Sequence, residues 1–117
     1  MDGRRKPKRK SKSPSKKIII EMKKSTKSDK KYMVLIGNKT VHFGAKGYED
    51  YTIHREKERM KRYENRHRSR ENWKKSGIET AGFWSKWILW NKPNLMSSIK
   101  HTEKKFNIKI IYLSTNI

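Results

Sequence analysis

Several residue types that mark a defined chemistry are missing or scarce in this chain of 117 residues. There is no cysteine, which excludes disulfides, thiol catalysis and cysteine-bearing zinc sites. No apolar run approaches the ~20 residues of a membrane span, and no glycine-rich phosphate loop is present. Leu, Ile, Val and Phe number only 21 together, and this scarcity combined with high net charge is typical of disordered chains.

Charge of one sign dominates what is there. Lys and Arg number 32 against 11 Asp and Glu, a formal net charge of +21 that favours polyanionic partners. Residues 1–30 hold 13 of the cations, whereas all 12 aromatic residues lie in residues 31–117. Large aromatic side chains can build a core where aliphatic ones are few. The N-terminal segment has none of them, so we expect a disordered basic arm over residues 1–17. One small folded domain is predicted over residues 18–117.

Hydrophobic patterning within residues 18–117 predicts the α+β class. The expected structure is a sheet of three or four strands with about three helices on one side. An edge strand is predicted at 18–22, a hairpin at 32–36 and 40–43 around Gly37-Asn38, and a last strand at 107–113. Helices are predicted from about 53 to 70, from 80 to 90 and from 94 to 106, with Thr80 and Asn94 as caps of the last two.

Arginines recur at spacings of three and four along the first predicted helix, over about 53–70. A row of guanidinium groups on one helix face suits phosphate oxygens, which the planar fork can bind in pairs. The tract RRKPKRK in the arm supplies further cations without sequence-specific geometry. The predicted nucleic-acid-binding residues are Arg4, Arg5, Lys6, Lys8, Arg9, Lys10, Arg55, Arg59, Arg62, Arg66 and Arg70.

The second predicted helix contains the tryptophan-rich run GFWSKWILW. Trp84, Trp87 and Ile88 share one face at core spacing, while Leu89 and Trp90 point elsewhere. A helix that is apolar nearly all round is buried on more than one side. The pattern therefore predicts a partner-docking surface made of Trp84, Trp87, Leu89 and Trp90 in addition to core contacts.

Residues that could perform catalysis or hold a metal form no recognisable motif. The four histidines lack the spacing of metal ligands. We therefore expect no catalytic residue, no metal, no cofactor and no enzymatic activity. A metal-dependent nuclease built on His42 and His54 with Glu56 or Glu58 is a weaker alternative.

A family of small basic proteins carries segments similar to five stretches of this chain. They are VHFGAKGYEDYTIH (41–54), RMKRYENRH (59–67), ENW (71–73), GIETAGFWSKWILWNKPNL (77–95) and SI (98–99). The likeness extends over residues 31–106, and the family is found in nucleocytoplasmic large DNA viruses, the giant viruses of protists and algae. Its function is unknown, so it transfers no catalytic residue. The resemblance implies a protein of the virion or of the viral factory in an infected cell, not a secreted one.

Two functions follow from these observations. The first is a non-enzymatic viral protein, a component of the particle, that binds nucleic acid without sequence specificity through the arm and the arginine-rich helix. Its expected partners are DNA in the first place and other particle proteins. The alternative is a minor capsid protein whose arm and tryptophan-rich helix dock on neighbouring subunits. The sequence leaves open the oligomeric state and the choice between DNA and RNA.

Overall fold

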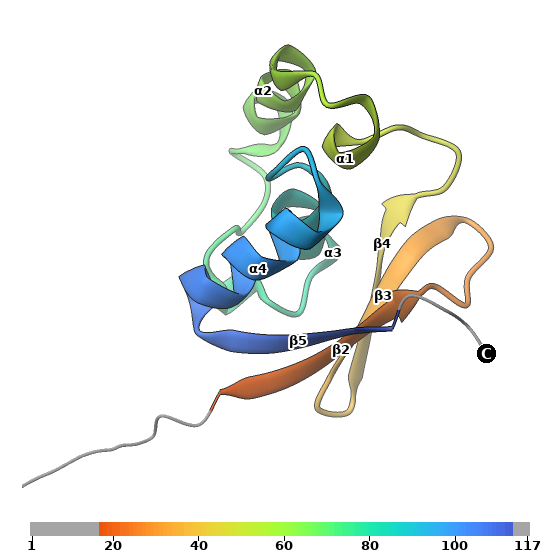
Figure 1. Ribbon diagram of the computed structural model, residues 1–117, viewed down its shortest axis with the longest axis vertical. Coiled ribbons are helices and arrows are strands. Elements are labelled where there is room, and N and C mark those ends of the chain that lie inside the picture. Colours follow the sequence, from red (N-terminus) through yellow and green to blue (C-terminus); the bar gives the residue numbers. More distant parts are fainter. Residues whose placement is uncertain (1–16, 114–117) are drawn as a thin grey trace, which may run out of the picture.

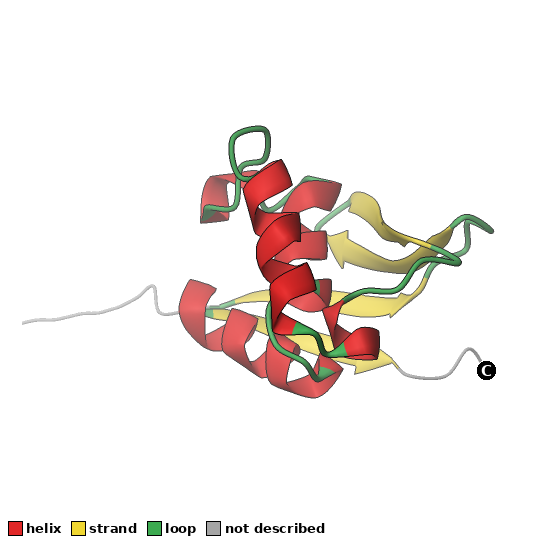
Figure 2. Ribbon diagram, turned by 90° about the horizontal axis from the view of Figure 1, so that it is seen from above, coloured by secondary structure: helices red, strands yellow, loops and turns green. Residues whose placement is uncertain are grey.

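The computed structural model describes residues 17–113, which form a four-stranded mixed sheet with helices packed on one face (Figure 1, Figure 2). The strands are β2 (Ile18–Lys24), β3 (Lys30–Ile36), β4 (Lys39–Ala45) and β5 (Ile108–Leu113). The helical elements are α1 (Tyr51–His54), α2 (Lys57–His67), the 3₁₀ turn η2 (Lys75–Gly77), α3 (Ala81–Trp84), the π-helical turn η3 (Ser85–Leu89) and α4 (Leu95–Phe106). The predicted α+β class is confirmed. Apart from Lys17, the predicted arm lies outside the described residues.

The sheet has the order β4-β3-β2-β5. β3 pairs antiparallel with both β2 and β4, whereas β5 returns after the helices and pairs parallel with β2. The prediction of β2 as an edge strand is therefore wrong, because β5 covers its second edge. The hairpin of β3 and β4 is confirmed, with Ile36 paired to Lys39 across the two-residue turn.

The core lies between one face of the sheet and the helices that follow α2 in the chain. Alternate residues of each strand point into it, as the two-residue period of a strand requires. The sheet contributes Ile20, Met22, Val34, Ile36, Val41, Phe43, Ile108 and Ile110, and the helical elements contribute Phe83, Trp84, Ile88, Leu89, Ile99 and Phe106. Aromatic rings thus fill core positions that aliphatic residues are too few to fill, as the composition predicted.

Side-chain caps fix where the later helices begin. The Thr80 hydroxyl accepts a hydrogen bond from the Phe83 amide at the start of α3, and the Asn94 side chain accepts one from the Ser97 amide at the start of α4. Both caps confirm the prediction. Asn107 ends α4 in the left-handed conformation at φ 55, after which β5 starts directly.

The tryptophan-rich segment departs from the predicted regular helix. After the single turn of α3 it widens into η3, where the Trp90 amide donates to the Ser85 carbonyl five residues back at 3.1 Å. A π turn has more than 3.6 residues, so the faces predicted for a regular helix do not apply beyond Trp84. Leu89 consequently points into the core and is 2% exposed.

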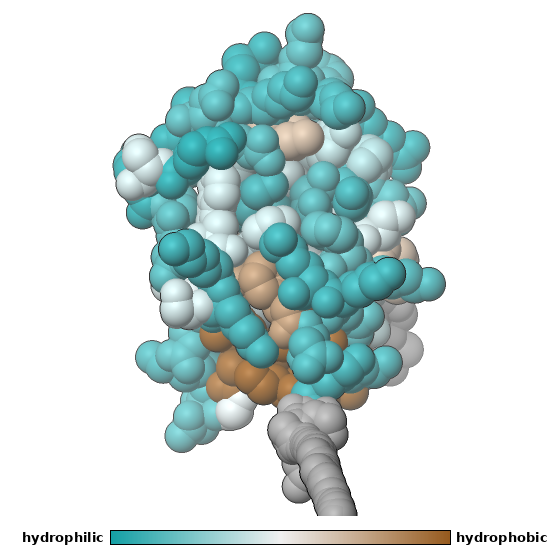
Figure 3. Space-filling view, turned by 90° about the vertical axis from the view of Figure 1, so that its left-hand side faces the viewer, coloured by the Kyte–Doolittle hydropathy of each residue, from teal (hydrophilic) through white to brown (hydrophobic). Residues whose placement is uncertain are grey.

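The opposite face of the sheet carries exposed apolar side chains. Ile19 of β2 is 62% exposed, and Ile111 and Leu113 of β5 are also exposed. Figure 3 shows hydrophobic surface at the lower end of the molecule, around the point where β2 begins. Among residues 17–113, no helix combines the length and apolar character needed to cross a bilayer.

Gly44 in β4 gives a direct test of how closely η3 packs on the sheet. A Cβ atom at Gly44 would lie 2.8 Å from Leu89 Cδ1, whereas one at Gly47 would meet nothing within 4 Å. Both glycines have positive φ, at 82° and 91°, so both alanine variants carry the same kind of backbone strain. We expect Gly44→Ala to lower the free energy of unfolding by about 1–3 kcal/mol more than Gly47→Ala, as measured by urea denaturation. Equal losses for the two variants would contradict this packing.

Candidate functional site

The most cationic continuous segment of the domain is α2 with its flanks. Residues 55–70 hold eight Lys and Arg against three Glu. α2 lies at one end of the molecule, away from the sheet (Figure 1). Of its eleven residues only Tyr63 is buried. The exposed cationic residues of this segment are Arg55, Lys57, Lys61, Arg62, Arg66, Arg68 and Arg70.

The predicted ridge of five arginines on one helix is only partly correct. Arg59, Arg62 and Arg66 lie on α2, but Arg55 precedes it in the left-handed conformation at φ 59. Arg70 follows α2 in a turn, where its amide donates to the His67 carbonyl at 2.9 Å. The ridge therefore has three members on the helix, with the other two arginines at its ends.

Two buried tyrosines account for the break in the helix. Tyr51 of α1 is 7% exposed and Tyr63 of α2 is 6% exposed. On one straight helix, side chains twelve residues apart would point about 120° away from each other. The break at Arg55 lets both rings pack on the folded body. The first of the two helices, α1, begins at its own cap: the Asp50 side chain accepts a hydrogen bond from the Thr52 amide at 2.9 Å.

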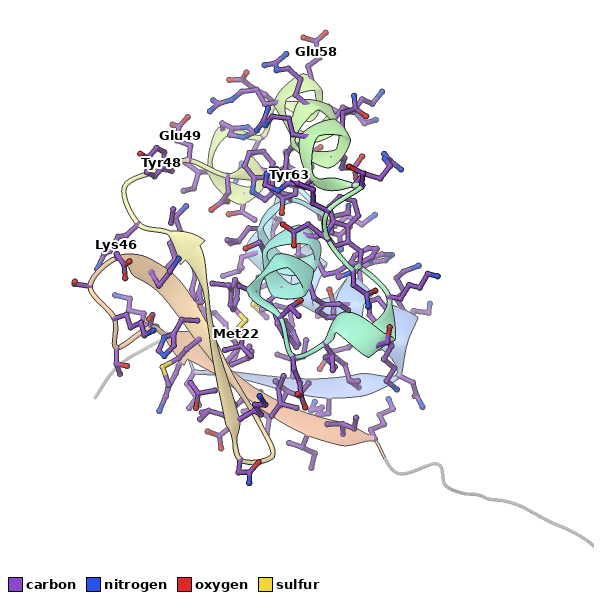
Figure 4. The ribbon with its side chains drawn as sticks, turned by 180° about the vertical axis from the view of Figure 1, so that it is seen from behind. Met22, Lys46, Tyr48, Glu49, Glu58 and Tyr63 are labelled. Carbon is purple, nitrogen blue, oxygen red and sulfur yellow. The ribbon has the colours of Figure 1, made fainter. Side chains whose placement is uncertain are left out.

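α2 is attached to the body through an aromatic stack. The ring of Tyr63 lies parallel to that of Trp90, with centroids 4.5 Å apart and an interplanar angle of 1°. Figure 4 shows Tyr63 on the side of α2 that faces α3. Burial raises the pKa of Tyr63 well above its usual value, and the negative charge of Glu71 raises it further. The phenol therefore stays protonated at neutral pH.

A partly buried ion pair provides the second attachment of α2. Lys86 of η3 is 7% exposed, and its Nζ donates to Glu64 Oε2 at 2.6 Å. The same ammonium lies 4.8 Å from the ring centre of Trp87 and 5.4 Å from that of Trp73. Desolvated ammonium groups over aromatic rings gain cation–π energy as well as the ion pair. The two attachments hold α2 in place even though it contributes a single residue to the core.

A cleft of about 500 Å³ separates α2 from the edge of the sheet. Its lining includes Lys30 and Lys31 of β3, Gly44 and Ala45 of β4, Arg59, Tyr63, Arg66 and His67 of α2, and Gly82, Ser85 and Trp90 on the far wall. The loop after β4 forms the outer rim, where Figure 4 shows Tyr48 and Glu49. The cleft thus brings part of the predicted arginine ridge next to two lysines of the sheet.

Ion pairs account for some of the charge in the cleft. Lys31 Nζ lies 2.6 Å from Asp50 Oδ2, and Arg59 lies 2.9 Å from Glu49. No carboxylate among residues 17–113 lies within 4 Å of the charged groups of Lys30 or Arg66, which therefore leave positive charge facing the cleft.

A second hollow of about 400 Å³ adjoins the cleft and shares Lys30 and Lys31 with it. Its other lining residues are Lys24, Ser25, Tyr32 and Lys46, so no acidic side chain lines it. Burial raises the pKa of Tyr32 to about 12, assisted by the neighbouring Tyr112, so this hydroxyl also stays neutral. The two hollows form a cationic track from α2 to the end of the sheet where β2 ends, β3 begins and β4 ends, away from the Gly37-Asn38 turn.

Sequence reasoning missed these lysines. They come from the ends of three strands, and only the fold brings them beside α2. The one signal in the sequence is the density of lysine in residues 23–31, between the predicted strands at 18–22 and 32–36. The predicted arm residues Arg4, Arg5, Lys6, Lys8, Arg9 and Lys10 lie outside the described residues.

The predicted docking surface on the tryptophan-rich helix is wrong for Trp84 and Leu89. They are 0% and 2% exposed, because the sheet covers one side of the segment and the other helices cover the rest. Trp87 and Trp90 are partly buried within the chain itself, Trp87 against Phe106 and Trp90 against Tyr63. The tryptophan-rich segment is thus buried on several sides, as its pattern predicted, but the residues that cover it belong to the same chain.

Within residues 17–113, no cluster of three or more His, Asp or Glu side chains has the arrangement of a metal site. Four Lys and Arg line the cleft against three carboxylates, Glu49, Asp50 and Glu71, whereas the adjoining hollow is lined by lysines with no carboxylate. Ammonium and guanidinium groups bind anionic oxygen atoms.

Comparison with known proteins adds one family. Residues 20–67, from the third residue of β2 to the end of α2, match a family of unknown function (DUF5754). No curated protein is significantly similar to the chain, and no solved structure is either. The matched stretch contains most of the cationic track but ends before the tryptophan-rich segment that holds α2.

The attachment of α2 through Lys86 can be tested by substitution. Lys86→Met leaves the Glu64 carboxylate without its short partner, and we expect a loss of about 1–3 kcal/mol in the free energy of unfolding. Arg68→Met is the matched control, because it removes the other cation near Glu64, which is exposed and 3.9 Å away. The control should cost less than about 0.5 kcal/mol. Urea denaturation measures both, and equal costs would contradict a specific role for Lys86.

Proposed function

We propose that the protein binds nucleic acid without sequence specificity, with α2 and the adjoining cationic track holding the phosphate backbone. One observation carries the proposal. α2 and the residue that follows it expose five cations. Of these five, only Arg68 has a carboxylate of residues 17–113 within 4 Å, namely Glu64 at 3.9 Å. The exposed cations are Lys57, Lys61, Arg62, Arg66 and Arg68.

The charge pattern of α2 works against the helix in isolation. Lys57 and Lys61 are four residues apart, and so are Arg62 and Arg66. Like charges at this spacing destabilise a helix by about 0.2–0.5 kcal/mol per pair. Glu58 is spaced to pair with Arg62, yet it points into solvent at the tip of α2 (Figure 4) and no such ion pair forms. A bound polyanion would relieve this repulsion. A surface that served only to keep the protein soluble would not need cations placed four residues apart on one helix.

The geometry favours phosphate over base contacts. Phosphate contacts position a protein on nucleic acid without reading sequence, and neutralising them releases condensed counterions. Guanidinium forks on α2 and ammonium groups in the track supply such contacts. The basic tract of the arm adds to the same electrostatic attraction through its sequence alone.

The setting of this activity is also part of the proposal. In keeping with the resemblance noted from the sequence, we place the protein in the virion or viral factory of a large DNA virus, with DNA as its first partner. We assign it no enzymatic activity. The alternative of a capsid protein docking through its tryptophan-rich helix loses support, because Trp84 and Leu89 are buried in the chain's own core.

Binding to a short duplex should depend steeply on salt. If about six to ten phosphates are engaged, affinity falls about 10³–10⁵-fold between about 50 and 200 mM salt. The combined variant Lys61→Gln, Arg62→Gln and Arg66→Gln keeps good helix-forming residues and should reduce the slope of log affinity against log salt by about 2.7. Fluorescence anisotropy of a labelled duplex measures both quantities.

The matched control removes three exposed lysines that line none of the hollows described here. They are Lys27, Lys39 and Lys92, each changed to Gln. The net charge falls equally in the two variants, so the control should retain most of the wild-type slope. A wild-type affinity that does not change with salt, or identical slopes for the two variants, would refute the proposal.

A further inference from the structure

We infer that the chain has a second phosphate-binding surface, at the opposite end of the molecule from α2, and that it bridges two segments of nucleic acid. The inference rests on the proposed function and extends it from one binding surface to two. The second surface is a hollow of about 270 Å³ where the start of β2, the C-terminal half of α4 and the start of β5 meet. It is lined by Lys17, Lys100, Glu103, Lys104, Ile108 and Lys109.

The hollow is cationic because four lysines line it against a single carboxylate, Glu103. Glu103 Oε2 accepts a hydrogen bond from the Ile110 amide of β5 at 2.7 Å. Within residues 17–113, no carboxylate lies within 4 Å of the ammonium groups that line the hollow. Four lysines against one carboxylate leave an excess of positive charge that suits anionic oxygen atoms.

A role in stabilising α4 would explain only some of the four lysines that line the hollow. Lys104 lies in the last turn of α4, where a cation interacts favourably with the helix dipole. Lys100 lies one turn earlier, and like charges four residues apart destabilise the helix. Lys17 and Lys109 come from outside α4, one before β2 and one in β5. Stabilising α4 does not require either of them, so their convergence points to a ligand.

The position of the hollow favours nucleic acid as that ligand. Lys17, which lines the hollow, follows the basic tract RRKPKRK in the sequence after the segment SKSPSK. α2 and the start of β2 lie toward opposite ends of the long axis (Figure 1). Because the two cationic surfaces lie at opposite ends, nucleic acid held at one leaves the other open to a second segment. Each can hold its own segment, and binding of the first raises the effective concentration of the second.

Capture of a second duplex tests the inference with the full chain. A biotinylated duplex is immobilised, loaded with protein, washed and exposed to a fluorescent duplex at about 50 mM salt. The wild type should retain the fluorescent duplex. The combined variant Lys100→Gln, Lys104→Gln and Lys109→Gln should load onto the immobilised duplex as well as the wild type does, through α2, yet lose most of the capture. Its salt slope for capture should fall by about 2.7.

Each of the following outcomes would overturn the inference. A wild type that does not load onto the first duplex refutes the proposed function and this inference with it, whereas loading without capture refutes this inference alone. The hollow is not the second site if capture is unchanged in the variant. It is also not the second site if the combined control Lys27→Gln, Lys39→Gln and Lys92→Gln reduces capture equally. The same holds if the variant loses binding to phosphatidylserine vesicles while keeping capture, since the hollow would then bind lipid.

Discussion

The stack of Tyr63 on Trp90 fixes the position of the most cationic helix in the domain. α2 buries a single residue, so its attachment depends on this ring pair and on the bond from Lys86 to Glu64. Stacked aromatic pairs contribute about 0.5–1.5 kcal/mol beyond the area they bury. That contribution offsets the repulsion of like charges along α2, and it fixes where those charges point. The cleft beside the sheet exists because the stack holds α2 at this position.

The arrangement separates two tasks within a small chain. Large aromatic side chains and one face of the sheet build the core, while the cations lie on α2, on the strand ends and around the end of α4. The π turn links the two tasks, because it carries both Leu89 toward the sheet and Lys86 toward Glu64. A regular helix would not direct these side chains in the same way.

The features that could be predicted from sequence are those set by local patterns. The apolar run at 32–36 and the Gly37-Asn38 turn predict the β3–β4 hairpin, and cap residues such as Thr80 and Asn94 predict helix starts. The rest depends on contacts distant in sequence. The central place of β2 follows from its pairing with β5, and the break at Arg55 follows from the burial of Tyr51 and Tyr63. The lysines of the track come together only when the sheet has formed.

The central claim is that α2 and the track beside it are the surface that meets nucleic acid. Amide chemical-shift changes of the full chain, recorded while a short duplex is added, test it most directly. The account predicts the largest changes in α2 and at Lys30 and Lys31, with the exposed apolar face of the sheet at Ile19 and Ile111 little affected. Large changes at that face with α2 unchanged would contradict it.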